Sequence, residues 1–129
     1  MDIPLSLKGF DVELAIERML GQPELWWEAV GLFVQHFSAW ENEWLAARGD
    51  DELERKKVHA LRSAAANVGA NKLSCAAAVL EELISMRLAG KRVIIPSSVR
   101  WYVQDCFREV WHSASDARLH QSILAGCLP

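Results

Sequence analysis

The segment that decides this fold runs from His59 to Ala70 and reads His59-Ala60-Leu61-Arg62-Ser63-Ala64-Ala65-Ala66-Asn67-Val68-Gly69-Ala70. It is a helix-forming segment with a run of small side chains, and it ends in a glycine that permits a turn. Residues three and four apart share a helix face, so Arg55 and Lys56 lie one turn before His59. Arg62 and Ser63 lie one turn after it. We therefore expect the histidine on a basic helix face with little bulk beyond it, where a large anionic partner can reach it.

Apolar periodicity predicts four helices, over residues 22–47, 51–69, 72–89 and 97–124. A cap signal and Gly21 predict a short helix over residues 11–20, whose apolar positions form no clean stripe. Asp11 is the expected cap of this short helix, and Asp51 with Glu54 the expected capping box of the helix over residues 51–69. Residues 91–95 have β propensity, but no second strand exists to pair with them. Four long amphipathic helices joined by short loops predict an all-α fold, an antiparallel four-helix bundle with the short N-terminal helix covering one end.

The expected core follows these helix faces. Trp26, Trp40 and Trp44 follow the apolar face of residues 22–47, whereas Trp27 and Trp101 are expected at the surface. In the helix over residues 51–69 the predicted buried side chains are Leu53, Val58, Leu61, Ala64, Ala65 and Val68. Cys75 and Cys106 lie in apolar helical patterns and are predicted to be small core residues.

The segment around His59 resembles the signature of histidine-containing phosphotransfer (HPt) domains of two-component phosphorelay signalling. Five features fall in register with the family pattern: His59, Leu61, the basic Arg62, the small residues 64–66 and Gly69. Residues 10–90 match best. The resemblance implies a single HPt-like domain over residues 1–129, with a leader over residues 1–9 and a final helix over residues 97–124.

The resemblance implies that His59 accepts a phosphoryl group from the aspartate of a receiver domain and passes it to another receiver. Histidine can carry such a group covalently on one ring nitrogen. In our hypothesis Arg62 clamps the phosphoryl oxygens, Arg55 and Lys56 steer the anionic partner, and Ser63 and Ala66 form the contact surface.

The expected partners are response-regulator receiver domains and a hybrid sensor histidine kinase. The chain has no nucleotide-binding loop and no acidic metal cluster, so we expect no ATP-dependent kinase activity, no bound cofactor and no metal site. The resemblance implies that Mg²⁺ comes with the receiver domain. We expect a monomeric phosphoprotein, a carrier more than a catalyst. The sequence names neither the cognate kinase nor the stimulus, and it leaves open whether the domain stands alone or belongs to a hybrid kinase.

Two alternatives remain. The family has glycine at the position of Ser63 and lysine at the position of Arg62. The serine side chain stands where glycine lets a partner approach closely, which motivates a docking or adaptor module that binds a receiver or kinase without being phosphorylated. The second alternative is the dimerisation and phosphoacceptor helices of a sensor kinase, which predicts a stable dimer.

Composition limits the remaining function classes. The chain has 129 residues, of which 51% are hydrophobic, with a net charge of -3 and a pI near 5.8. This acidic balance argues against nucleic acid as a partner. The three cysteines are far apart and form no metal or disulfide pattern, so reduced thiols are expected. No signal peptide or membrane span is visible, and the expected location is the cytoplasm.

Overall fold

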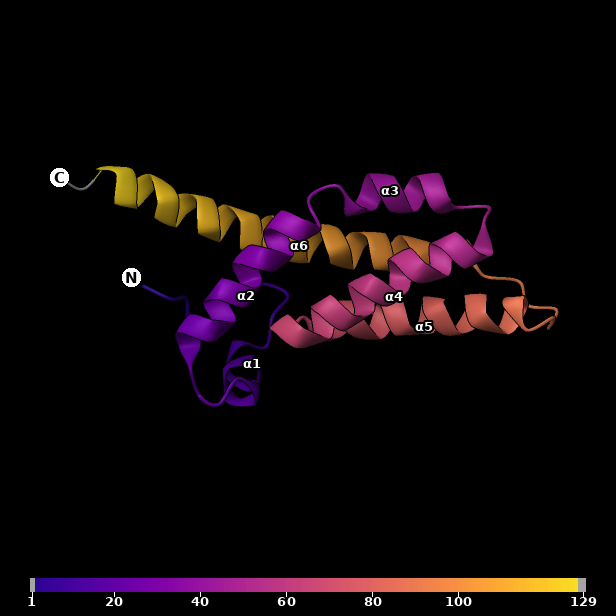
Figure 1. Cartoon of the computed structure of the whole chain (residues 1–129), viewed down its shortest axis with the longest axis horizontal. Helices are drawn as coiled ribbons and strands as arrows, with labels where there is room; N and C mark the ends of the chain where they lie inside the picture. The colour runs from indigo at the N-terminus through magenta and orange to yellow at the C-terminus, as the bar shows by residue number, and fades with distance from the viewer. Residues whose placement is uncertain (1, 128–129) are drawn as a thin grey trace.

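The computed structural model describes residues 2–127, and over that range the protein is all-helical (Figure 1). Its helices are α1 (Val12–Arg18), α2 (Pro23–His36), α3 (Trp40–Ala47), α4 (Asp51–Val68), α5 (Asn71–Leu88) and α6 (Ser97–Cys127). Within residues 2–127 the only β-type pairing is an isolated bridge between Leu7 and Phe10. The predicted all-α class is therefore confirmed.

The helices pack around the pair formed by α4 and α5, which lie side by side along most of their length (Figure 1). Helix α6 packs on α5 with its first half and continues past the end of this pair, where it meets α2. Its 31 residues span about 46 Å. Helix α2 also contacts α4, and α1 packs on α2. Helix α3 lies along the outside of the first part of α4.

The predicted single helix over residues 22–47 is wrong, because the chain breaks between α2 and α3. The amide of Phe37 closes α2 by donating to the Phe33 carbonyl at 3.0 Å, and the Trp40 amide donates to the Phe37 carbonyl at 3.1 Å. The Ser38 hydroxyl donates to the Gln35 carbonyl at 3.2 Å. The apolar spacing continues across this break because both helices bury side chains in one core, so periodicity alone did not reveal it.

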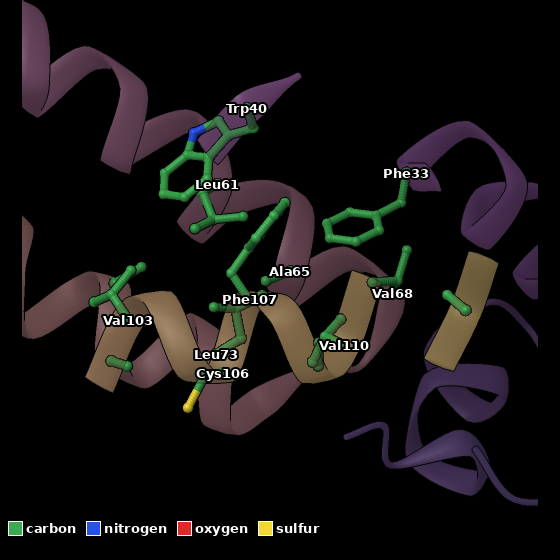
Figure 2. Packing of buried hydrophobic residues seen from close by; sticks show 14 of the residues in the cluster. Phe33, Trp40, Leu61, Ala65, Val68, Leu73, Val103, Cys106, Phe107 and Val110 are labelled. Carbon is green, nitrogen blue, oxygen red and sulfur yellow. The ribbon is translucent and has the colours of Figure 1, made fainter. Parts of the chain in front are cut away.

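The core joins side chains from most helices, and Figure 2 shows Phe33, Trp40, Leu61 and Phe107 meeting from α2, α3, α4 and α6. The rings of Trp40 and Phe107 lie 4.8 Å apart between centroids. Trp26, Trp40 and Trp44 are buried as predicted. Burying large aromatic side chains supplies much of the apolar contact area in a domain of this size.

The structure tests the predicted burial of five further side chains. Trp27 was expected at the surface, but it is buried against α6, where Arg118 lies over its ring and Gln121 accepts its indole N–H. Trp101 is exposed as predicted. Leu53 and Cys75 were expected in the core and are exposed, whereas Cys106 is buried.

The N-terminus of α4 differs from the expected capping box. The N-cap is Asp50, whose carboxylate accepts from the Leu53 amide at 3.1 Å. Asp51 instead accepts two hydrogen bonds from Arg87 of α5, at 2.7 and 2.8 Å. Glu54 is completely buried and takes no part in the cap. A cap at Asp50 leaves the side chains of Asp51 and Glu54 free to bind neighbouring helices.

The turn from α4 into α5 depends on Gly69, as predicted. Its φ of 84° lies in the left-handed region that favours glycine, and it forms the C-cap of α4. A Cβ at this position would lie 2.6 Å from the Cβ of Ala15 in α1. The Asp11 amide donates to the Gly69 carbonyl at 2.9 Å, and the Trp26 indole donates to the Val68 carbonyl at 2.8 Å. The end of α4 is thereby fixed against α1 and α2.

Candidate functional site

His59 lies on the exposed face of α4, and its side chain retains 53% of its accessible surface. Its Nδ1 lies 2.8 Å from Oε2 of Glu81 on α5. An ionised carboxylate only accepts hydrogen bonds, so Nδ1 carries the hydrogen in the neutral imidazole. That tautomer leaves the lone pair on Nε2, the nitrogen at the other edge of the ring. The contact with Glu81 thus selects which nitrogen of an accessible histidine is nucleophilic.

Arg62 meets the same carboxylate from the next turn of α4. Its Nη1 lies 3.1 Å from Oε1 of Glu81, whose side chain is 13% exposed. This contact brings opposite charges together but lacks hydrogen-bond geometry, so Oε1 is a buried oxygen without a hydrogen-bond partner in residues 2–127. The guanidinium is 43% exposed, and no aligned hydrogen bond to Glu81 restrains it. It is therefore free to turn toward an anion that reaches His59.

The two other predicted cations precede His59 on α4. Arg55 donates to Glu52 at 2.8 Å in an exposed ion pair between the first turns of the helix. Lys56 is exposed, and none of the ion pairs found within residues 2–127 includes it. Of the three cations around His59, Arg62 is therefore the one that the structure brings onto the same carboxylate as the histidine.

The predicted contact residues follow His59 toward the C-terminus of α4. Ser63 is exposed one turn after the histidine, and Ala66 is half-buried about two turns after it. The Ser74 hydroxyl of α5 donates to the Arg62 carbonyl at 3.2 Å and fixes the two helices to each other at this level. The exposed face beyond His59 therefore carries small side chains on a firmly held helix.

Small buried residues allow Glu81 to reach the histidine. Ala65 of α4 and Ala77 of α5 are fully buried, and small buried side chains let packed helix axes approach closely. Larger partners, Leu61 and Leu80, fill the core on either side. The close approach of the two backbones lets a side chain from each helix meet at the outer edge of the helix pair.

Local sequence patterns around His59 do not reveal the role of Glu81, because Glu81 lies on the following helix. The chain contains a signal of this contact: His59 and Glu81 are each eleven residues away from Ala70, which with Gly69 forms the turn between α4 and α5. Two antiparallel helices joined by a tight turn bring equidistant residues to the same level. The hairpin symmetry could therefore have identified the partner of the histidine.

A second pair of charges fixes the other end of this helix hairpin. Two hydrogen bonds from Arg87 lower the pKa of Asp51, with partial burial acting in the opposite direction. The same contact raises the pKa of Arg87. This ion pair joins α4 and α5 two turns before His59, so the register of the two helices is fixed on both sides of the site.

Comparison of the chain with protein-family models, with curated proteins and with solved structures found no match. Among residues 2–127, no group of three or more histidine, cysteine or acidic side chains is placed to hold a metal ion. No helix in that range combines the length and apolar character needed to cross a membrane.

Proposed function

We propose that the chain is an HPt domain, a phosphorelay carrier that accepts a phosphoryl group on His59 from a receiver-domain aspartate and passes it to another receiver. The observation that carries the proposal is the hydrogen bond between Nδ1 of His59 and Glu81 on an exposed helix face. It prepares Nε2 as a nucleophile that a partner protein can reach.

In the proposed reaction Nε2 of His59 attacks the phosphorus of an aspartyl phosphate in line with the bond to be broken. The new N–P bond forms as the bond between phosphorus and the aspartate oxygen breaks, and the aspartate leaves as a carboxylate. The imidazole becomes positively charged because Nδ1 keeps its hydrogen. Glu81 stabilises that charge and holds the ring orientation. The reverse reaction delivers the group to a second receiver.

Charge neutralisation falls to Arg62. Phosphoryl transfer depends mainly on positioning and on compensation of the phosphoryl charge. The Arg62 guanidinium is held near Glu81 by a contact without hydrogen-bond geometry. It can therefore turn to bind the phosphoryl oxygens without breaking an aligned hydrogen bond. Arg55 and Lys56 lie one turn earlier and attract the anionic partner. In this proposal the receiver domain supplies Mg²⁺, and the carrier works as a cytoplasmic monomer in series with a hybrid sensor histidine kinase.

We infer that the helices form the antiparallel four-helix bundle expected for such a domain, with α1 covering one end. The broken segment α2–α3 takes the place of one long helix, beside α4, α5 and α6. Contacts of α5 with α4 and α6, and of α2 with α4 and α6, support this arrangement. The bundle presents His59 on a rigid helix in place of a mobile loop.

The docking-module alternative rests on Ser63, which is exposed one turn beyond His59 on the same face. If its hydroxymethyl group keeps a receiver too far from Nε2, the domain binds without being phosphorylated. Ser63→Gly then restores transfer. If transfer is already present and the substitution leaves it unchanged, the serine is tolerated and the alternative fails.

The test mixes the protein with a phosphorylated receiver domain and Mg²⁺ and measures acid-labile, base-stable phosphate on the protein. His59→Gln is expected to abolish labelling while the helical circular dichroism signal persists. His120→Gln is the matched control, since His120 is also exposed on a helix, and it is expected to be labelled normally. Labelling that survives His59→Gln would refute the carrier assignment.

A further inference from the structure

A second surface lies on the opposite side of α5 from His59. A groove of about 320 Å³ runs between α5 and α6. Its apolar lining comes from Cys75, Ala76 and Val79 of α5 and from Val99 and Tyr102 of α6. Val79 is 53% exposed and Tyr102 is 48% exposed. Contiguous exposed apolar side chains of this kind mark interaction sites on soluble proteins.

The groove is independent of the site at His59. Val79 and Glu81 are two residues apart in α5, so their side chains leave the helix about 200° apart. Glu81 contacts His59 and Arg62 on α4, whereas Val79 lines the groove beside α6. A partner in the groove and a partner at His59 would therefore use different faces of α5.

Acidic side chains border the groove. Glu82 lies one turn after Val79 on the exposed side of α5, and Asp105 and Glu109 follow Tyr102 along the exposed side of α6. Lys72 is the cation that lines the groove. Asp105 and Glu109 come three and seven residues after Tyr102, so the helix register places them on the side of α6 that carries this groove-lining residue. Three carboxylates against one ammonium leave the border negative.

We propose that this groove is the docking site for a basic amphipathic helix of a partner protein. Such a helix inserts apolar side chains spaced at i, i+3 or i+4 and i+7 between two helices of its receptor. Its lysine or arginine side chains would meet Glu82, Asp105 and Glu109. The groove offers few polar groups to orient a small molecule, which normally needs several convergent ones. Its negative border repels anionic lipid surfaces.

The probe is a fluorescein-labelled peptide of about 18 leucine and lysine residues, long enough to form a helix, with leucines at i, i+3, i+4 and i+7. The control peptide has glutamate in place of every lysine. Fluorescence anisotropy with the full chain is expected to detect binding of the basic peptide and none of the acidic one. Raising the salt concentration is expected to weaken the binding.

Substitutions locate the binding on the molecule. Val79→Asn is expected to lower the affinity for the basic peptide by at least about tenfold, equivalent to about 1.4 kcal/mol. Leu32→Asn is the matched control, because Leu32 is a 48% exposed apolar residue on α2, and it should not change the affinity. Glu82→Gln with Asp105→Asn should weaken binding at low salt and reduce its salt dependence. Circular dichroism checks that each variant is folded.

Three results would overturn the proposal. Binding of the acidic peptide as tightly as the basic one would remove the electrostatic argument. Equal losses from Val79→Asn and Leu32→Asn, or no binding at all, would show that the groove is not the site. A concentration-dependent dimer in light scattering that Val79→Asn abolishes would identify a second copy of the chain as the occupant. None of these results bears on phosphorylation of His59, which is measured separately.

Discussion

Glu54 on α4 and Glu81 on α5 each meet an arginine, but the two carboxylates are bound in contrasting ways. Glu54 is completely buried, and Arg100 donates to both of its oxygens at 2.9 and 3.0 Å. Glu81 lies at the edge of the helix pair, where Oε2 binds His59 and Oε1 faces Arg62 without an aligned hydrogen bond. One carboxylate is fully paired and the other is left partly unpaired.

The difference in hydrogen bonding follows from where each carboxylate lies, in the core or at the edge of the helix pair. A charge in the core is tolerated only when its hydrogen-bonding capacity is filled, and the indole of Trp44 completes the set around Glu54 at 2.9 Å. The contact joins α3, α4 and α6 into one unit. At Glu81 the loosely held Arg62 remains available to another anion. The first arrangement serves the fold, and the second leaves a cation ready for use.

The comparison predicts its largest effect at Glu54. Glu54→Ala removes a completely buried carboxylate and leaves Arg100, whose side chain is 13% exposed, without its partner; breaking a buried ion pair costs about 3–5 kcal/mol of unfolding free energy. Urea denaturation followed by circular dichroism measures it. Glu81→Ala is the matched control at the other carboxylate and should cost about 1 kcal/mol or less, because its partners His59 and Arg62 are 53% and 43% exposed and stay solvated without it. Similar losses in both variants would remove the distinction.

The next effect concerns the turn that places Glu81 opposite His59. Gly69→Ala puts a Cβ at a positive φ and in contact with Ala15, which together cost about 2–3 kcal/mol of stability. Gly90→Ala is the control, since Gly90 also has a positive φ but nothing lies within 4 Å of the added Cβ. Thermal and urea unfolding should show a smaller loss for Gly90→Ala. Equal losses of stability in the two variants would mean that the contact of Gly69 with α1 adds nothing to the cost of Gly69→Ala.

A smaller effect is expected on the rate of phosphotransfer. Glu81→Gln keeps an oxygen that can accept from Nδ1 of His59 but removes the charge that stabilises the imidazolium. We expect transfer from a phosphorylated receiver to slow by about tenfold, which corresponds to about 1.4 kcal/mol of transition-state stabilisation. Stability should change little. Unaltered kinetics in both Glu81→Gln and Glu81→Ala would show that the carboxylate has no part in the reaction.

The smallest expected change in stability is that caused by breaking the ion pair between Asp51 and Arg87. Because Arg87 lowers the pKa of Asp51 in the folded protein, the pair adds stability above the ordinary aspartate pKa of about 4, and that stability is lost as the pH falls through the lowered value. The pair is partly exposed, so Asp51→Asn should cost about 1 kcal/mol or less at pH 7. Urea titrations at several pH values should show that the difference in unfolding free energy between the wild-type protein and Asp51→Asn shrinks below about pH 4. A constant difference would exclude the ion pair as its cause.

The course of α4, α5 and α6 could be predicted because their apolar spacing and end signals agree, whereas α1 could be predicted from its end signals alone. Asp11 accepts from the Leu14 amide as an N-cap should, and Gly69 ends α4 where expected. The break between α2 and α3 has no proline or glycine to announce it. It arises because α3 must lie on α4 while α2 crosses to α6, a demand of tertiary packing.

The candidate site was predicted only in the part that one helix carries. His59, Arg62 and Ser63 lie on a single face of α4, so local spacing sufficed to bring them together. Glu81 enters from another helix, and its role depends on the level at which α5 packs on α4. The burial of Trp27 likewise required contacts with α6, which are remote in the chain.

The turn at Gly69 also fixes how many residues must separate His59 from Glu81. His59 and Glu81 meet because equal numbers of residues separate them from Ala70. One inserted residue between Ala70 and Glu81 would rotate the glutamate by about 100° and advance it by about 1.5 Å, while most of the surrounding sequence stayed the same. Substitutions within this interval are therefore limited only by packing, whereas a single insertion or deletion is expected to separate Glu81 from His59.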